Sequence, residues 1–267
     1  MQSVKGWLAR AFRRLSSPLI EGIYPPACVA CEELLEENES VFCSDCRLVY
    51  EEAKARECSR CFHPRSRCLC SKRPLEAMRI PRLVKLYTYR AGQIDLPQNR
   101  LIYALKHHHR RDVRSLLSDE LTNAIVAGIP NVGGFVITHA PRSQRAIFLD
   151  GYDHIEELAE TMADMLGIPF VRAISRKPGG RVQKELSSEE RKRNMLGRFY
   201  ASENVNLHGK SVFVVDDVTT SGATLTEAGR ILYEMGAATV VGVVISTTGK
   251  DSRDKPKKYS IQYKTMR

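Results

Sequence analysis

The pattern of apolar and polar positions along the chain predicts buried strands alternating with helices. Strands are expected at 135–137, 169–174, 212–215 and 239–245, where the residues are largely apolar and often β-branched, as is typical of strands covered on both faces. Helices are expected where apolar residues recur every three or four positions, at 97–106, 112–127, 155–166 and 225–232. A further strand is expected within 83–89. This order predicts a doubly wound, mostly parallel α/β sheet.

Helix ends are also readable from the sequence. Asp112 is expected to cap the helix that begins there, and Gly128 with Pro130 to end it. Gly167 and Gly236 should end two later helices. The basic stretch at 175–195 is expected to be a loop with a short helix that acts as an active-site lid; Ser187-x-x-Glu190 within it forms a capping box.

The strand at 212–215 leads into the most informative stretch of the chain. Asp216 and Asp217 follow it, and a run of hydroxyl side chains around Gly222 comes next, before a helix. The first amides of a helix lack internal acceptors and bind anions, and glycine lets the backbone approach a phosphate closely. Two carboxylates would repel that phosphate, but they suit sugar hydroxyls or a metal. The pattern therefore predicts a site for a phosphorylated sugar.

Two other interpretations of this stretch are weaker. An ordinary polar turn between strand and helix does not need so many hydroxyls. A nucleoside triphosphatase would need a P-loop, which Gly209-Lys210-Ser211 imitates, but Asn204 replaces the first glycine and a strand follows. A second basic segment, after the strand at 135–137, contains Arg142, Ser143 and Arg145 at the sheet edge where such folds bind ligands. Lys106 is expected to face an anionic site.

All eight cysteines lie between residues 28 and 70. They form closely spaced pairs: Cys28 and Cys31, Cys43 and Cys46, Cys58 and Cys61, Cys68 and Cys70. Such pairs place two thiolates on one side of a tight turn, and two pairs complete the tetrahedron that Zn²⁺ prefers. Two structural zinc ribbons are therefore expected, with disulfides as the alternative. Sequential and crossed pairing remain open, as does replacement of one ligand by His63.

Length and charge set the context for these motifs. The 267 residues suit an N-terminal helix with a zinc module over 1–75 and a larger domain over 76–267. No apolar run approaches the ~20 residues of a membrane span. Basic residues interrupt the N-terminus, which predicts a cytoplasmic protein without a secretory leader. Residues 4–15 read as a basic amphipathic helix, either a lid on the module or a membrane-surface element. The net charge of +10 favours anionic partners such as phosphorylated ligands, nucleic acid or an acidic protein. A basic surface that is merely solvated is about as compatible with this charge as a nucleic-acid site.

The stretch at 212–224 resembles the phosphoribosyl pyrophosphate (PRPP) signature of type I phosphoribosyltransferases, in which apolar run, acidic pair and hydroxyl loop occur together. The resemblance implies that Asp216 and Asp217 are catalytic and hold the ribose hydroxyls, and that Mg²⁺ accompanies PRPP. It also implies PRPP binding by the loop and, for the pyrophosphate, by the basic segment: Thr219, Thr220, Ser221, Gly222, Ala223, Thr224, Arg142, Ser143 and Arg145.

The double zinc ribbon before such a domain is similar to the ComF family of bacteria, over about residues 20–247. Five positions match the family's spacing: Gln183, Leu186, Ser187, Arg191 and Asn194. The tetrad Gly151-Tyr152-Asp153-His154 departs from the family's Gly-aromatic-Asn-Gln pattern in its last two residues. The resemblance implies a link to DNA uptake in natural transformation, with single-stranded DNA or a competence helicase as partners.

Three functions are compatible with these features. The chain is expected to transfer phosphoribosyl groups to an acceptor that the motifs do not identify. In the alternative, the same pocket senses PRPP or a nucleotide without turnover, while the zinc ribbons and basic surface bind DNA or a partner. A purely structural adaptor would not bind PRPP at all.

Overall fold

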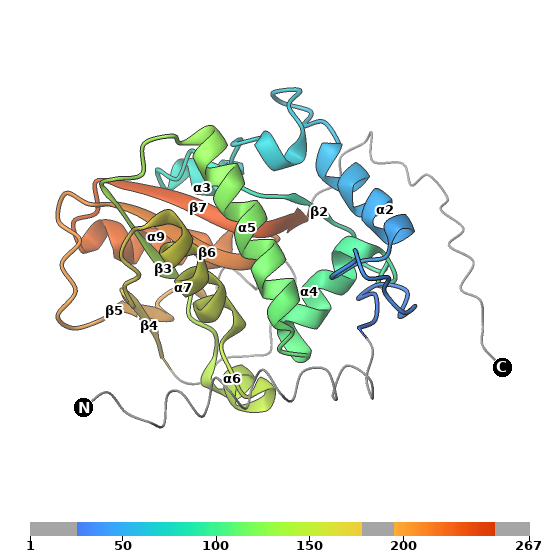
Figure 1. The fold of residues 1–267 in the computed structure, drawn as a ribbon. Coiled ribbons are helices and arrows are strands. Elements are labelled where there is room, and N and C mark those ends of the chain that lie inside the picture. Colours follow the sequence, from blue (N-terminus) through green and yellow to red (C-terminus); the bar gives the residue numbers. More distant parts are fainter. Residues whose placement is uncertain (1–25, 178–194, 249–267) are drawn as a thin grey trace, which may run out of the picture.

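A five-stranded parallel sheet forms the centre of the computed structural model, which describes residues 26–177 and 195–248 (Figure 1). Strand β7 lies between β6 on one side and the two short strands β1 and β2 on the other, and β6 continues to β3. The strands are β1 (Leu83–Val84), β2 (Tyr87–Tyr89), β3 (Phe135–His139), β6 (Ser211–Thr219) and β7 (Thr239–Thr248). The prediction of a doubly wound, mostly parallel sheet is confirmed.

Helices cover both faces of this sheet. On one face lie α5 (Arg111–Gly128) and α7 (His154–Leu166), which pack against each other in front of the sheet in Figure 1, with α4 (Pro97–His107) beside them. The opposite face is covered by α9 (Ala223–Glu234), against which the short α3 (Arg73–Ala77) packs. Strand alternation separates the two cores, because Phe213 and Val215 pack with α5 and α7 whereas Val212 and Val214 pack with α9.

The central strand is longer than the apolar run that predicts it. It was expected to end at Val215, with the acidic pair beyond its end, but β6 continues through Thr219. The long β7 provides ladder partners there, pairing Asp216 with Val244 and Thr219 with Thr247. The two aspartates therefore belong to the strand, and alternation places Asp217 on the α5 and α7 face and Asp216 on the α9 face.

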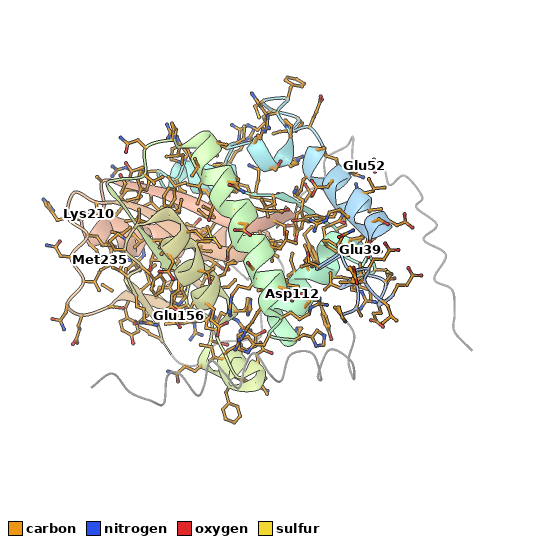
Figure 2. The ribbon with its side chains drawn as sticks, in the orientation of Figure 1. Glu39, Glu52, Asp112, Glu156, Lys210 and Met235 are labelled. Atoms are coloured by element: carbon orange, nitrogen blue, oxygen red, sulfur yellow. The ribbon has the colours of Figure 1, made fainter. Side chains whose placement is uncertain are left out.

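Two local predictions are wrong. The expected strand at 169–174 is reduced to one parallel bridge between Ile137 and Phe170. Pro169 has no N–H to donate to a ladder, and the chain forms regular pairing only in β4 (Ile174–Arg176), antiparallel to β5 (Phe199–Ala201). Asp112 does not cap α5 but lies in its first turn (Figure 2), where its carboxylate accepts a hydrogen bond from Arg110 at 2.5 Å.

Four helical elements of the described residues lie outside the predicted pattern: α2 (Ser44–Ala55), the 3₁₀ turn η1 (Arg65–Arg67), α3 and α6 (Gln144–Asp150). The predicted helix at 4–15, the lid with its capping box, the five positions that match the ComF spacing and the basic tail lie outside the described residues. None of the helices in the described ranges combines the length and apolarity that a membrane crossing needs.

The cysteine-rich segment shares a hydrophobic core with the sheet domain. Tyr50 of α2 is fully buried, with its ring centroid 5.1 Å from that of Phe42 and 5.7 Å from that of Tyr87 in β2. Its hydroxyl donates to Glu120 of α5. The segment is therefore packed onto the sheet domain, and the boundary at residue 75 stays a prediction.

Candidate functional site

A cleft of about 780 Å³ opens where β6 ends and α9 begins. One wall is continuous chain from Asp217 to Thr224, which includes every residue of the predicted hydroxyl loop. The opposite wall comes from α4, with Tyr103, Lys106 and His107. The structure thus brings the hydroxyl loop and one of the two predicted aspartates to a common cavity.

The hydroxyl loop has the geometry of an anion site. Gly222 is the N-cap of α9 and has a φ of +83°, a conformation that glycine adopts without strain. The side chain of no described residue caps α9 at Gly222, and the Ser221 hydroxyl accepts a hydrogen bond from the Ala223 amide at 3.4 Å. A helix of 12 residues with an uncapped N-terminus facing a cleft favours a bound anion, because its first amides and its dipole both attract negative charge.

Asp217 lies between two cationic or potentially cationic partners. Its Oδ2 is 2.5 Å from Lys106 Nζ and 3.5 Å from His154 Nε2. Burial alone would raise the pKa of Asp217, but the charge of Lys106 and the contact with His154 hold that pKa well below its usual value. Burial likewise opposes the charge on Lys106, yet Asp217 raises the pKa of this lysine. Both groups are therefore charged at neutral pH.

Asp216 has the opposite electrostatic character. Burial, followed by the negative charge of Asp217, raises the pKa of Asp216 to about 8. Its Oδ1 accepts a hydrogen bond from the Asp217 amide at 2.9 Å, and it faces the side of the sheet where Arg176 of β4 lies. At neutral pH the pair therefore carries one negative charge, on Asp217. Asp216 is not among the described residues that line the cleft.

The predicted basic segment is engaged elsewhere. Arg142 forms an ion pair with Asp150, with its Nη2 at 2.5 Å from Oδ2, and donates to the Tyr152 carbonyl at 3.2 Å. The Ser143 hydroxyl accepts from the Ala146 amide as the N-cap of α6, and Arg145 is exposed on that helix. These three residues follow β3 at the expected sheet edge, but they are absent from the described lining of the cleft.

His154 and Arg176 were not predicted as site residues. Lys106, which was expected to face an anionic site, lines the cleft and pairs there with the carboxylate of Asp217. His154, fully buried at the start of α7, aims its ring at Asp217, and Asp153 before it caps the helix by accepting from the Ile155 and Glu156 amides. The sequence did contain a signal for His154, because Asp153 and His154 replace the last two residues of the Gly-aromatic-Asn-Gln pattern of the ComF family. No sequence pattern indicated Arg176, because its place beside Asp216 depends on the antiparallel pairing of β4 with β5.

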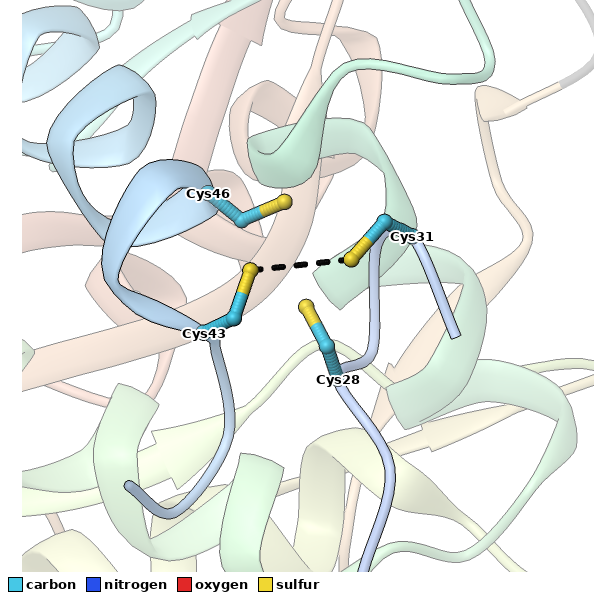
Figure 3. A group of neighbouring side chains, drawn as sticks. All are labelled: Cys28, Cys31, Cys43 and Cys46. Carbon is cyan, nitrogen blue, oxygen red and sulfur yellow. Dashed lines mark hydrogen bonds between the residues drawn. The ribbon is translucent and has the colours of Figure 1, made fainter. Parts of the chain in front are cut away.

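The cysteines form two groups of four in sequential order. Cys28, Cys31, Cys43 and Cys46 point toward one another in Figure 3, with all sulfur atoms of the group within 4.8 Å and the Cys31 and Cys43 sulfurs 3.6 Å apart. A second group consists of Cys58, Cys61, Cys68 and Cys70. A Zn–S bond of about 2.3 Å requires sulfurs about 3.8 Å apart, which these groups approach.

The eight thiols are free, so no disulfide joins them. His63 lies outside the second group, with its Nδ1 2.9 Å from the Cys61 carbonyl oxygen, so the thiols supply all four of the donors grouped there. Both groups thus fit a metal ion that prefers four thiolates.

Comparison with known proteins agrees with this architecture. Residues 155–267 match the model of the phosphoribosyl transferase domain. A protein named DNA utilization protein YhgH from Salmonella typhimurium is 26% identical over 227 residues, which span 81% of this chain and 94% of that protein. A ribose-phosphate pyrophosphokinase from Saccharolobus solfataricus is 28% identical over 99 residues, 33% of this chain and 34% of its own. Adenine phosphoribosyltransferase from Saccharomyces cerevisiae, a solved structure, gives a TM-score of 0.34 with 16% identity, covering 52% of this chain and 71% of its own, too low a score to support an argument.

Proposed function

We propose that this chain, which has a phosphoribosyl transferase domain and resembles ComF-like proteins, binds PRPP with Mg²⁺ in the cleft lined by β6, α9 and α4. One observation carries the proposal. The uncapped N-terminus of α9 and the ionised carboxylate of Asp217 face the same cavity. A phosphorylated ribose has an anionic end for the first and hydroxyl groups for the second.

The two ends of the ligand have separate partners in this proposal. The 5′-phosphate lies against the amides and hydroxyls from Thr219 to Thr224. Asp217, being ionised, accepts hydrogen bonds from the ribose hydroxyls, and Asp216, being protonated, supports its partner without adding a second repulsive charge. Arg142 and Arg145 reach the pyrophosphate only if Arg142 leaves Asp150.

Transfer of the ribosyl group follows from these positions. The bond between the anomeric carbon and the pyrophosphate oxygen breaks, and its electron pair leaves with pyrophosphate. A lone pair of the acceptor forms the new bond to that carbon, and the proton of the acceptor passes to solvent water. The negative charge of Asp217 stabilises the positive charge that develops on the ring. When bound with PRPP, Mg²⁺ would neutralise part of the negative charge of the pyrophosphate leaving group.

The cysteine groups serve folding in this account. Each binds one Zn²⁺, and four thiolates leave no open position for a substrate, so both metals are structural. Asp217 already has Lys106 and His154 as partners, so its carboxylate fits ribose recognition better than direct ligation of Mg²⁺.

Calorimetric titration with PRPP and Mg²⁺ tests the site. The native chain and an Asp119→Asn variant, changed at an exposed carboxylate on α5, should bind equally. Asp217→Asn should weaken binding at least about tenfold, because the acceptor for the ribose hydroxyls loses its charge. Equal affinity of all three proteins would remove the assignment.

A second candidate is a PRPP sensor without turnover, favoured by the ion pair that ties Arg142 to Asp150 and away from the cleft. In that case the PRPP-bound protein binds single-stranded DNA or a competence helicase. The name of the YhgH relative, DNA utilization protein, is in keeping with a partner connected with DNA. Pyrophosphate release with a panel of nucleobases, nucleosides and amines favours the enzyme. Salt-sensitive DNA binding without such release favours the sensor.

A further inference from the structure

The second cysteine group is joined to the hydroxyl loop by a short segment of chain. Cys70 is the last ligand of the group, and Lys72 follows two residues later as the N-cap of α3. The segment is anchored on the cysteine side, because Lys85 Nζ donates to the carbonyls of Cys68 at 2.8 Å and Cys70 at 2.9 Å. The Cys70 amide also donates to the Cys68 sulfur at 3.4 Å. The position of Lys72 therefore depends on whether the second cysteine group is held in a fixed conformation.

Lys72 reaches from this anchor to the floor of the cleft. Its Nζ donates three hydrogen bonds to backbone carbonyls, at 2.9 Å to Thr219, 2.5 Å to Thr220 and 2.8 Å to Thr248. All three acceptors line the cleft, and they come from the ends of the two central strands. Hydrogen bonds from an ammonium are about twice as strong as neutral ones, so one side chain holds both strand ends together.

The same segment supports the loop at a second point. Leu75 of α3 is fully buried, and a Cβ placed on Gly222 would lie 3.3 Å from its Cγ. Lys72 thus holds the carbonyl side of the hydroxyl loop while Leu75 packs beneath its glycine. The first cysteine group differs, since its buried cysteines belong to the core on the α5 and α7 face of the sheet, whereas Leu75 belongs to the core under α9.

We propose that Lys72 is a positioning residue that transmits the order of the second cysteine group to the hydroxyl loop, so that loading of this group with metal sets the loop's affinity for a phosphorylated ribose. The ligand in this statement rests on the proposed function. The coupling itself concerns only the chain's own residues, so it is measurable without any ligand.

Hydrogen exchange of the loop peptides around 216–224 in the metal-loaded protein tests the coupling. Lys72→Met removes the three hydrogen bonds and keeps the aliphatic stem, and Arg73→Met changes the exposed neighbouring cation as the matched control. We expect exchange in the loop to become at least about tenfold faster in Lys72→Met and to stay unchanged in Arg73→Met. Lys72→Arg, which retains charged donors, should restore part of the protection.

A pair of cysteine variants makes the same test independent of whether Lys72→Met folds. Cys61→Ser disrupts the second group and Cys31→Ser the first, both at partly exposed positions. Loop exchange should rise in Cys61→Ser and not in Cys31→Ser. Equal exchange in the two cysteine variants, or loop protection in Lys72→Met like that of Arg73→Met, would overturn the proposal.

Titration with PRPP separates this proposal from the proposed function. Lys72→Met should bind about tenfold more weakly than Arg73→Met. If the native chain does not bind PRPP but loop exchange still follows Lys72 and Cys61, the coupling stands and the proposed ligand falls. If PRPP binds the native chain and both lysine and arginine variants alike, with unchanged loop exchange, the proposed function stands and the coupling falls.

Discussion

Lys106 of α4 and Asp217 of β6 form an ion pair across the cleft, with 2.5 Å between Nζ and Oδ2. The two residues come from opposite walls of the cavity, and each keeps the other charged despite partial burial. The pair gives the cleft one fixed positive and one fixed negative group. That combination suits a ligand with phosphate groups at one end and sugar hydroxyls at the other.

Replacement of this lysine should affect both stability and binding. Lys106→Met leaves the Asp217 carboxylate, 19% exposed, without its strongest partner, and we expect the free energy of unfolding to fall by about 1–3 kcal/mol. PRPP affinity should also fall at least about tenfold, because the anionic ligand loses an attractive charge. Urea unfolding and calorimetric titration measure the two effects.

Lys210→Met is the matched control, because Lys210 is exposed and is absent from the described lining of the cleft; Figure 2 shows it at the edge of the molecule. A double variant, Lys106→Met with Asp217→Asn, should recover part of the lost stability, since the unpaired charge is removed. Stability and affinity in Lys106→Met equal to those of the control would contradict the role given to the pair.

The pH dependence of stability should report the protonated state of Asp216. An acid whose pKa is higher in the folded than in the unfolded chain binds more protons when folded, so stability falls as pH rises between the two values. For Asp216 these are about 8 in the folded chain and about 3.9 when unfolded. Between about pH 5 and 8, its contribution should fall by up to about 1.4 kcal/mol per pH unit.

The measurement is the difference between urea-unfolding free energies of the native chain and Asp216→Asn across this range. The native profile should fall more steeply with rising pH than the variant's. Asp217 does not interfere, because its lowered pKa stabilises the fold above about pH 4 and that contribution is lost only below it. Parallel profiles would show that Asp216 is ionised in the folded protein.

Gly222 should be intolerant of a side chain. Gly222→Ala places a Cβ at a φ of +83° and 3.3 Å from Leu75, which we expect to cost about 1–2 kcal/mol of stability and to weaken PRPP binding. Gly134→Ala is the control, since nothing lies within 4 Å of its added Cβ and its φ is not positive. Thermal unfolding and titration of the two variants compare them directly, and equal behaviour would argue against a strained, closely packed loop.

Metal content should follow the two cysteine groups separately. The purified protein should contain about two zinc ions per chain, and Cys46→Ser should contain about one, because it removes a ligand from the first group only. Its thermal midpoint should fall by about 5 °C or more, since the first group lies against the core around Tyr50. Elemental analysis with calorimetry measures both, and full zinc content in Cys46→Ser would refute the ligand assignment.

Much of the fold was predictable because its signals are local. Apolar runs marked β3, β6 and β7, and glycines after α7 and α9 marked helix ends, as the positive φ values of Gly167 and Gly236 confirm. Paired cysteine spacing likewise predicted two groups of four thiols, but it left sequential and crossed pairing open, and the fold brings the pairs together in sequential order. In contrast, α6 spans only seven residues and buries none of them, and α2 buries only Cys46, Tyr50 and Ala53, so the apolar spacing that predicts a helix is weak in both.

The site was predictable in part for the same reason. The hydroxyl loop and Asp217 are consecutive in sequence, so one motif revealed them together. The partners of that motif, Lys106, His154 and Lys72, come from three distant segments, and only the packed fold brings them near it. The ion pair between Arg142 and Asp150 could not be predicted either, because the sequence does not show whether a basic residue in a loop is free or paired with a carboxylate.

A crystal structure of the complex with PRPP and Mg²⁺ tests the central claim most directly. The account predicts the 5′-phosphate at the N-terminus of α9, contacted by Thr219 to Thr224, with the ribose hydroxyls beside Asp217. Density for the ligand at another surface, or a cleft without ligand under saturating PRPP, would contradict it.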